Sequence, residues 1–201
     1  GYAPEDFVGL LHYLRHRGFT EPELESSGLV KRSAKGNLYD IFRHRVMVPI
    51  IDVRGNIIAF GGRVMDDSKP KYINSPETVV YKKSRTLFAL NVAKKSTSKR
   101  YILCEGYMDV ISMHEAGFDT AVCACGTALT PEQVKLLTEY ADEVVLSYDS
   151  DEAGQKATER SLALFSGTNL QVRVLNIPGA KDPDEFIRTY GRDRFEAVLE
   201  G

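Results

Sequence analysis

Three carboxylate residues follow two apolar segments of the sequence, where they could hold a divalent cation. Glu105 comes directly after the segment Tyr101–Cys104, and Asp149 and Asp151 come after a second segment, residues 144–148. If the two segments are neighbouring strands, the carboxylates converge, and two of them about 5 Å apart repel by roughly 3 kcal/mol at an effective dielectric of about 20. A cation would turn that repulsion into binding energy, and all-oxygen ligation favours Mg²⁺ or Mn²⁺ over zinc.

A structural alternative explains part of this pattern. Asp is a favoured residue at the N-cap of a helix, so Asp149 or Asp151 could simply cap a helix that begins near Glu152. That role accounts for one carboxylate, whereas the sequence places three at the ends of two strands.

The elements around these residues predict how they are positioned. Short apolar segments rich in strand-forming residues are typical of strands buried on both faces of a parallel sheet. Between the apolar segments 101–104 and 144–148 lie two helical patterns and a third apolar segment. The predicted order is therefore strand, helix, strand, helix, strand. In such a sheet, ligands bind beyond the carboxyl ends of the strands. The expected elements are strands at 101–104, 120–124 and 144–148 and helices at 107–116 and 131–140.

Another acidic pair follows a further expected strand. Residues 153–165 continue as a helix, and a strand at 171–177 leads to Asp182 and Asp184. Asp-Pro-Asp before apolar residues is an ordinary helix start. Its position after a strand equally allows a second metal site, and the sequence leaves both interpretations open.

Several segments resemble a known family. Glu105–Val110 followed by Asp149–Gly154 is similar to the Toprim domain, the metal-binding fold shared by bacterial primases, topoisomerases and some nucleases. Three earlier segments resemble the bacterial DnaG-type replicative primases more specifically: Phe42–Ile50, Phe60–Arg63 and Pro70–Thr78. The resemblance covers nearly the whole chain.

The resemblance implies a chain of the α/β and α+β classes with two domains. A Toprim domain, a parallel sheet flanked by helices, would occupy residues 96–201 and bind metal. A smaller, mixed α+β basic domain at residues 1–95 would precede it and bind template and nucleotide. The polar segment Lys94–Arg100 has no periodicity and marks the boundary.

The activity that the resemblance implies is primer synthesis. A DNA primase copies single-stranded DNA into short RNA primers from ribonucleoside triphosphates, by nucleotidyl transfer that depends on Mg²⁺ or Mn²⁺. The family's zinc-binding module has no counterpart in this fragment, and its module for the replicative helicase would lie beyond Gly201. Another Toprim enzyme, a topoisomerase or a nuclease, and a non-catalytic DNA-binding scaffold remain as alternatives.

By the same resemblance, residues of this sequence receive expected roles. The acidic residues expected in catalysis are Glu105, Asp109, Asp149 and Asp151. The expected metal ligands are Glu105, Asp149, Asp151, Asp182 and Asp184. The expected ligands of nucleic acid and nucleotide are Arg43, Arg45, Arg63, Lys71, Asn74 and Lys83.

The charge distribution agrees with this division. Residues 1–100 contain 18 Lys and Arg against 10 Asp and Glu, whereas residues 101–201 contain 8 against 18. An acidic half suits a metal site and a basic half suits a phosphate backbone, so the partition favours a metal-dependent enzyme acting on nucleic acid. Solvated surface helices would give a milder partition. The basic half also interleaves cations with tyrosines and an amide, which suits single-stranded nucleic acid.

The first hundred residues predict helices followed by strands. Residues 4–18 form an N-capped amphipathic pattern, and a second short helix lies within residues 20–28. Residues 45–52 and 56–60 read as a β-hairpin. The pair Gly61–Gly62 would then let the backbone turn sharply or approach a ligand closely.

Composition excludes some other classes. No apolar segment approaches the roughly 20 residues that span a bilayer, and the N-terminus lacks a signal-peptide pattern. We therefore expect a cytoplasmic bacterial protein that is associated with the nucleoid and does not contact a membrane. Cys104, Cys123 and Cys125 lack a Cys-x-x-Cys spacing and lie in or beside expected strands, so we expect reduced core thiols.

Overall fold

The computed structural model describes residues 1–201, which form two compact units. The first consists of Gly1–Ile51 and Asn56–Lys82, and the second of Asp52–Gly55 and Lys83–Gly201. The domain boundary that the sequence predicts, between residues 95 and 96, stays a prediction.

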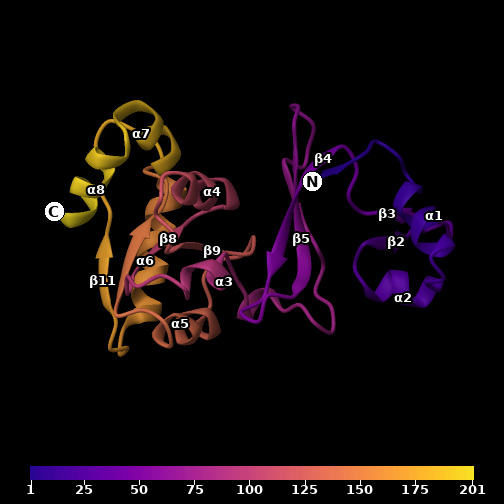
Figure 1. Cartoon of the computed structure of the whole chain (residues 1–201), viewed down its shortest axis with the longest axis horizontal. Helices are drawn as coiled ribbons and strands as arrows, with labels where there is room; N and C mark the ends of the chain where they lie inside the picture. The colour runs from indigo at the N-terminus through magenta and orange to yellow at the C-terminus, as the bar shows by residue number, and fades with distance from the viewer. The chain divides into compact units, whose positions relative to one another are not determined.

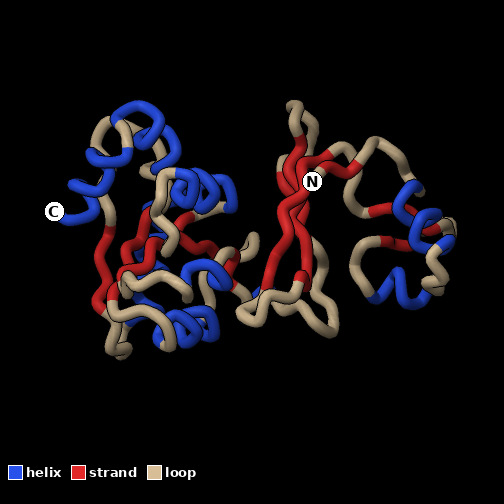
Figure 2. Tube along the Cα trace, viewed as in Figure 1, coloured by secondary structure: helices blue, strands red, loops and turns tan.

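The first unit contains an antiparallel sheet of four strands in the order β1, β4, β5, β6 (Figure 1, Figure 2). The two long strands form the hairpin that the sequence predicts. Its turn is closed by Asp52, whose side chain accepts from Arg54 N, and by Gly55, which has a left-handed φ of 96°. The strands are β1 (Tyr2–Ala3), β4 (Arg45–Ile51), β5 (Ile57–Val64) and β6 (Tyr72–Asn74).

Gly61 and Gly62 lie inside β5, which corrects the expectation of a sharp turn there. Both residues pair with β4 on one side and β6 on the other. A Cβ at Gly62 would lie 2.9 Å from Cδ1 of Phe42 and 3.0 Å from Cδ of Arg45. Gly62 therefore serves to make room for two neighbouring side chains.

A small helical lobe belongs to the same unit. Its apolar core consists of Leu11, Leu24, Val30 and Leu38. The second helix begins at the capping box of Thr20, as its sequence pattern indicates. The elements of the lobe are α1 (Gly9–His16), α2 (Glu21–Ser26) and the two-stranded sheet of β2 (Val30–Arg32) and β3 (Leu38–Asp40).

Helix α1 begins later than the sequence pattern indicates. Asp6 closes a local turn through its side chain and does not cap the helix. The cap comes instead from Asp40, whose two carboxylate oxygens accept from Leu10 N at 2.7 Å and Leu11 N at 2.9 Å. Because Asp40 lies 30 residues after Leu10, a search for a local N-cap cannot find it.

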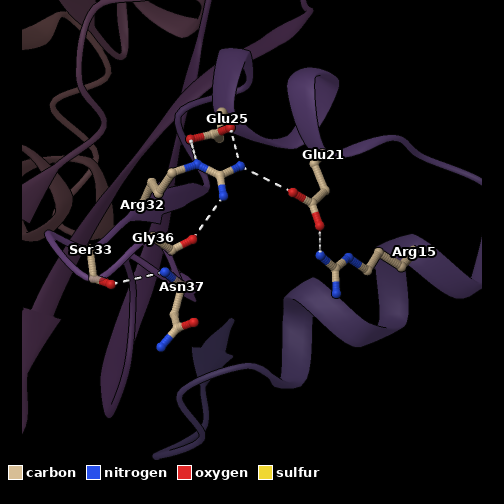
Figure 3. Close-up of polar contacts among 7 residues, drawn as sticks. All are labelled: Arg15, Glu21, Glu25, Arg32, Ser33, Gly36 and Asn37. Atoms are coloured by element: carbon tan, nitrogen blue, oxygen red, sulfur yellow. Dashed lines mark hydrogen bonds and ion pairs between the residues drawn. The ribbon is translucent and has the colours of Figure 1, made fainter.

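An exposed network of ion pairs connects the elements of this lobe (Figure 3). Arg32 binds the carboxylate of Glu25 through two nitrogens, at 3.1 and 2.8 Å, and that of Glu21 at 3.0 Å. Glu21 also pairs with Arg15 of α1. These side chains are 35–44% exposed, so each pair contributes at most about 1 kcal/mol and the apolar core holds the lobe together.

The second unit contains a five-stranded sheet in the order β11, β10, β8, β9, β7. The first four strands are parallel, and β7 pairs antiparallel at the edge. The four parallel strands are those that the sequence predicts, with ends that differ by a few residues. The strands are β7 (Leu87–Phe88), β8 (Arg100–Cys104), β9 (Ala121–Ala124), β10 (Glu143–Ser147) and β11 (Gln171–Val174).

Helices cover both faces of this sheet. The connection from β8 to β9 through α4 runs along the sheet toward β7, whereas the connections through α5 and α6 run toward β11. Because crossovers between parallel strands are right-handed, α4 lies on one face of the sheet and α5 and α6 lie on the other. Leu103 and Leu146 of the strands pack there against Leu137 of α5 and Phe165 of α6. None of the helices combines the length and apolarity that crossing a bilayer requires. The helices are η1 (Lys83–Arg85), α3 (Leu90–Ala93), α4 (Tyr107–Glu115), α5 (Pro131–Thr138), α6 (Glu152–Phe165), α7 (Pro183–Tyr190) and α8 (Arg192–Glu200).

The three cysteines are buried free thiols, which confirms the expectation from their spacing. Cys104 and Cys123 are cross-strand partners on β8 and β9. Burial raises the pKa of both thiols well above the ordinary value. They are therefore packing residues, because the reactive thiolate is disfavoured at neutral pH.

Candidate functional site

The carboxyl ends of β8 and β10 bring Glu105 and Asp149 together. The two strands are neighbours, with Cys104 opposite Ser147, which confirms the condition on which the expected convergence depends. The chain leaves these strands toward opposite faces of the sheet, and at such a switch point a crevice opens for ligands. The backbone N–H of Asp149 donates to Oε2 of Glu105 at 3.2 Å.

Three aspartates of the site also bind a backbone amide where a helix begins. Oδ2 of Asp109 accepts from the backbone N–H of Gly106 at 3.0 Å, at the start of α4. Oδ1 of Asp151 accepts from an amide of α6 at 2.9 Å, and Oδ1 of Asp182 accepts from an amide of α7 at 2.8 Å. Each bond fixes a side chain through one of its two oxygens, so capping and metal binding are compatible roles.

Asp184 is held by two side chains. The hydroxyl of Ser112 on α4 donates to Oδ1 of Asp184 at 2.5 Å, and Nε of Arg188 pairs with the same oxygen at 2.9 Å. The contact joins α4 to α7, which lie side by side in Figure 1. Because Ser112 is one turn after Asp109, the acidic pair of α7 is linked to the first turn of α4.

Burial and mutual repulsion raise the pKa values of two inner carboxylates. The pKa of Asp109 rises to about 6, because the group is largely removed from water and because Asp149, Asp182 and Glu105 carry negative charge nearby. Burial also raises the pKa of Asp149, and repulsion from Glu105 adds to the effect. The carboxylates therefore destabilise one another, and a divalent cation would relieve this repulsion.

Gly154 is a site residue whose role the sequence pattern does not reveal. A Cβ there would lie 2.0 Å from the carbonyl oxygen of Asp149. Helix α6 therefore begins tightly against the loop that carries Asp149, and glycine alone permits this approach. The sequence does give one signal of this role. Glycine has a low helix propensity, so a glycine in the first turn of an expected helix indicates that the position has another requirement.

Two cavities lie beside these carboxylates, along α6. One of about 530 Å³ is lined by Asp149 and Lys181, and one of about 360 Å³ by Glu105 and Arg160. Each combines an acidic with a basic side chain, although the sequence pattern identified neither cation. A larger cavity of about 880 Å³ opens at the amino ends of the strands, where open parallel sheets do not place their ligand sites.

The donor set has the chemistry of a site for a hard cation. Glu105, Asp149 and Asp151 offer carboxylate oxygens only, which suits Mg²⁺ or Mn²⁺ better than zinc. No group of three or more Asp, Glu, His or Cys side chains is gathered closely enough here to enclose an ion. The structure thus supplies the donors and the charge, and the ligand set itself stays a prediction.

One face of the sheet in the first unit gathers several expected ligands of nucleic acid. Arg63 of β5 lies opposite Tyr72 of β6, and Asn74 lies on the same face two residues further. The ammonium of Lys71 is 5.9 Å from the ring centroid of Tyr72. Nε of Arg63 is buried and makes no hydrogen bond, and such a donor is often completed by water or a ligand. We call Arg63, Tyr72 and Asn74, together with Lys71 just before β6, the basic strand face.

Arg45 lies inside the first unit and not on its surface. Its side chain is 5% exposed and donates to the backbone carbonyls of three residues, at 2.8 to 3.3 Å. These bonds fasten β4 to β5 and to the segment before β6. Arg45 therefore holds these segments together, and its expected role toward nucleic acid stays a prediction.

Arg43 and Lys83 do not belong to the strands of the basic strand face. The guanidinium of Arg43 stacks 4.4 Å from the ring centroid of Phe7 and donates to the carbonyl of Asp40. Lys83 belongs to the second unit, where Gln133 binds its backbone carbonyl at 2.9 Å. Their expected roles toward nucleic acid stay predictions.

Family models match both parts of the chain. Residues 1–94 match the model described as DNA primase catalytic core, N-terminal domain, and residues 102–187 match the model described as Toprim-like. The DNA primase of Clostridium acetobutylicum is 47% identical over 201 residues, which are the whole of this chain and 34% of that protein. The chain thus spans about a third of the length of the curated relatives that it matches.

Solved structures show the same fold. A DnaG primase catalytic domain bound to ssDNA is 36% identical, with a TM-score of 0.90 over all of this chain and 64% of that one. The RNA polymerase domain of the Mycobacterium tuberculosis primase DnaG is 32% identical, with a TM-score of 0.88 over all of this chain and 68% of that one. Sequence and fold therefore agree along the whole chain, which belongs to the catalytic-core family of the DnaG-type primases.

Proposed function

We propose that this chain is the catalytic part of a DNA primase, which copies single-stranded DNA into short RNA primers. The observation that carries the proposal is the pair of Glu105 and Asp149 at the switch point of a Toprim sheet, in a chain that is also primase-like over residues 1–94. The reaction is attack of a 3′-hydroxyl on the α-phosphate of a ribonucleoside triphosphate, and pyrophosphate leaves. Such a transfer needs positioning and neutralisation of charge more than covalent help.

The acidic residues would hold the metal and keep its ligands in place. When bound, Mg²⁺ or Mn²⁺ supplies positive charge to the reacting phosphate and to the leaving group. The helix amides that bind Asp151 and Asp182 fix the direction of these side chains before any ion arrives. Asp109 adds negative charge beside the same site. The expected ligands are Glu105, Asp149 and Asp151 for a first ion, with Asp182 and Asp184 completing that site or holding a second ion.

Template and nucleotide would bind to cations of both units. The basic strand face combines two cations with an aromatic ring and an amide, the mixture that suits a single strand. A related DnaG catalytic domain has been solved bound to ssDNA, which supports single-stranded DNA as the ligand. In the second unit, Lys181 and Arg160 line the cavities beside the carboxylates and would bind phosphate groups of the nucleotide.

The alternatives explain less of the chain. A topoisomerase or a nuclease would use similar carboxylates to cleave DNA, but the family that matches residues 1–94 is a primase family. A non-catalytic scaffold would have no use for carboxylates that raise the pKa of one another, because such repulsion lowers stability.

The test is primer synthesis by the 201-residue chain with single-stranded DNA, labelled ribonucleotides and Mg²⁺ or Mn²⁺. We expect short RNA products that disappear without metal and in the variants Glu105→Ala and Asp149→Ala. Asp151→Asn is the sharper variant, since Asn still caps α6 but carries no charge. Wild-type synthesis by Asp149→Ala would refute the site, and metal-dependent cutting of the template without synthesis would favour the nuclease.

A further inference from the structure

We infer that the hydroxyl of Ser112 is a positioning group of the metal centre, which aims the carboxylate of Asp184 at the cation. Ser112 lies outside the acidic motifs, in the middle of α4. The inference rests on the proposed function in one respect, that a divalent cation binds among these carboxylates.

Two donors hold the same oxygen of Asp184. The Ser112 hydroxyl lies 2.5 Å from Oδ1, the length of a strong hydrogen bond to a charged acceptor, and Nε of Arg188 lies 2.9 Å from that oxygen. Both bonds use Oδ1, so together they fix the plane of the carboxylate. Neither bond uses Oδ2, so this oxygen would remain for a cation.

Only one of the two donors can fix Asp184 relative to the rest of the site. Arg188 is on the same helix as Asp184, and its side chain is 73% exposed, so this ion pair is weak. Ser112 is partly buried and comes from α4, 72 residues earlier in the chain. Because the first turn of α4 carries Asp109, the Ser112 bond sets the spacing between the acidic residues of two helices.

Apolar packing also holds α7 in place. Phe186 of α7 is 2% exposed and packs against Phe195 of α8, with ring centroids 5.9 Å apart. A serine within a helix commonly bonds to a carbonyl of its own helix, whereas Ser112 donates to a carboxylate of another. Donors of this kind, which orient a metal ligand from behind, typically change metal affinity 10- to 100-fold when removed.

The experiment measures Mn²⁺ binding to the 201-residue chain by calorimetry and by electron paramagnetic resonance. Ser112→Ala should weaken Mn²⁺ affinity about 10- to 100-fold, whereas Ser112→Thr, which keeps the hydroxyl, should stay within about threefold of the wild type. Thr168→Ala is the matched control, because its hydroxyl donates to a carbonyl at the far end of α6 and should leave affinity unchanged. Arg188→Gln should cost less than about threefold.

A double variant separates positioning from general stability. Ser112→Ala should add no further loss of affinity in an Asp184→Ala background, since the group that it orients is gone. In thermal unfolding with EDTA, Ser112→Ala and Thr168→Ala should lower the midpoint to a similar extent. Only Ser112→Ala should also reduce the rise in midpoint that Mn²⁺ produces.

The outcomes distinguish this inference from the proposed function. Wild-type Mn²⁺ affinity in Ser112→Ala, or a loss that simply adds to that of Asp184→Ala, would overturn the inference and leave primer synthesis untouched. Weakened binding in Ser112→Ala, in a chain that synthesises no primer, would support the inference and count against the function. A wild-type chain that binds no Mn²⁺ would refute both.

Discussion

The raised pKa of Asp109 predicts that the contribution of this carboxyl to the stability of the metal-free protein falls as pH increases from about 4 to 7. In the unfolded chain this carboxyl releases its proton near its ordinary pKa of 3.8, whereas in the folded chain it keeps the proton until about pH 6. Between these values the native state binds more protons, so the free energy of unfolding falls as pH rises. The difference between the two pKa values corresponds to about 3 kcal/mol, and partial solvent access reduces this to about 1–3 kcal/mol.

Asp109→Asn isolates this contribution. Asn keeps an oxygen that can accept from Gly106 N, so the start of α4 is preserved while the charge is removed. In EDTA at pH 7.5 the variant should be more stable than the wild type by about 1–3 kcal/mol, and the difference should vanish near pH 4. Other titrating groups are shared by both proteins and largely cancel.

Urea denaturation followed by circular dichroism, from pH 4 to 8, measures the difference directly. Adding Mg²⁺ should raise the stability of the wild type more than that of Asp109→Asn, because the ion offsets a repulsion that the variant lacks. A variant that is less stable than the wild type at pH 7.5, or a difference that does not change with pH, would show that Asp109 is not strained by its neighbours.

Three further perturbations test other parts of the structure. Gly154→Ala should displace the Asp149 loop, lower stability by about 1–3 kcal/mol and abolish synthesis, and a crystal structure with an unmoved loop would contradict this. Arg45→Met should destabilise the first unit by about 2–4 kcal/mol in chemical denaturation, because three carbonyls lose their donor. Binding of single-stranded DNA should weaken with salt, with a log-log slope of about −4 if about six phosphates are neutralised, and a flat response in fluorescence anisotropy would argue against the basic strand face.

The acidic edge of the parallel sheet could be predicted because its signals are local. Strands buried on both faces leave short apolar segments, and the capping box at Thr130 marks the start of α5. Once β8 and β10 are neighbours, the rule for strand ends brings Glu105 and Asp149 together without further information.

The features that escaped prediction depend on contacts between distant residues. Asp40 caps a helix that lies 30 residues before it, so α1 begins later than its own pattern indicates. Arg45 can be buried because Gly62, on the neighbouring strand, has no side chain in its way. Ser112 reaches Asp184 across 72 residues. None of these contacts leaves a period or a spacing in the sequence.

Asp151 and Asp182 begin α6 and α7, and folding and the proposed function require different properties of them. The helix cap needs a side-chain oxygen, whereas metal binding needs the negative charge. Asn caps a helix about as well as Asp, so Asp151→Asn combined with Asp182→Asn would keep both caps and remove two negative charges. Cellular quality control acts on unfolded chains and would not remove such a protein. Under the proposed function, the inactive copies would persist at normal abundance and compete with active copies for template DNA.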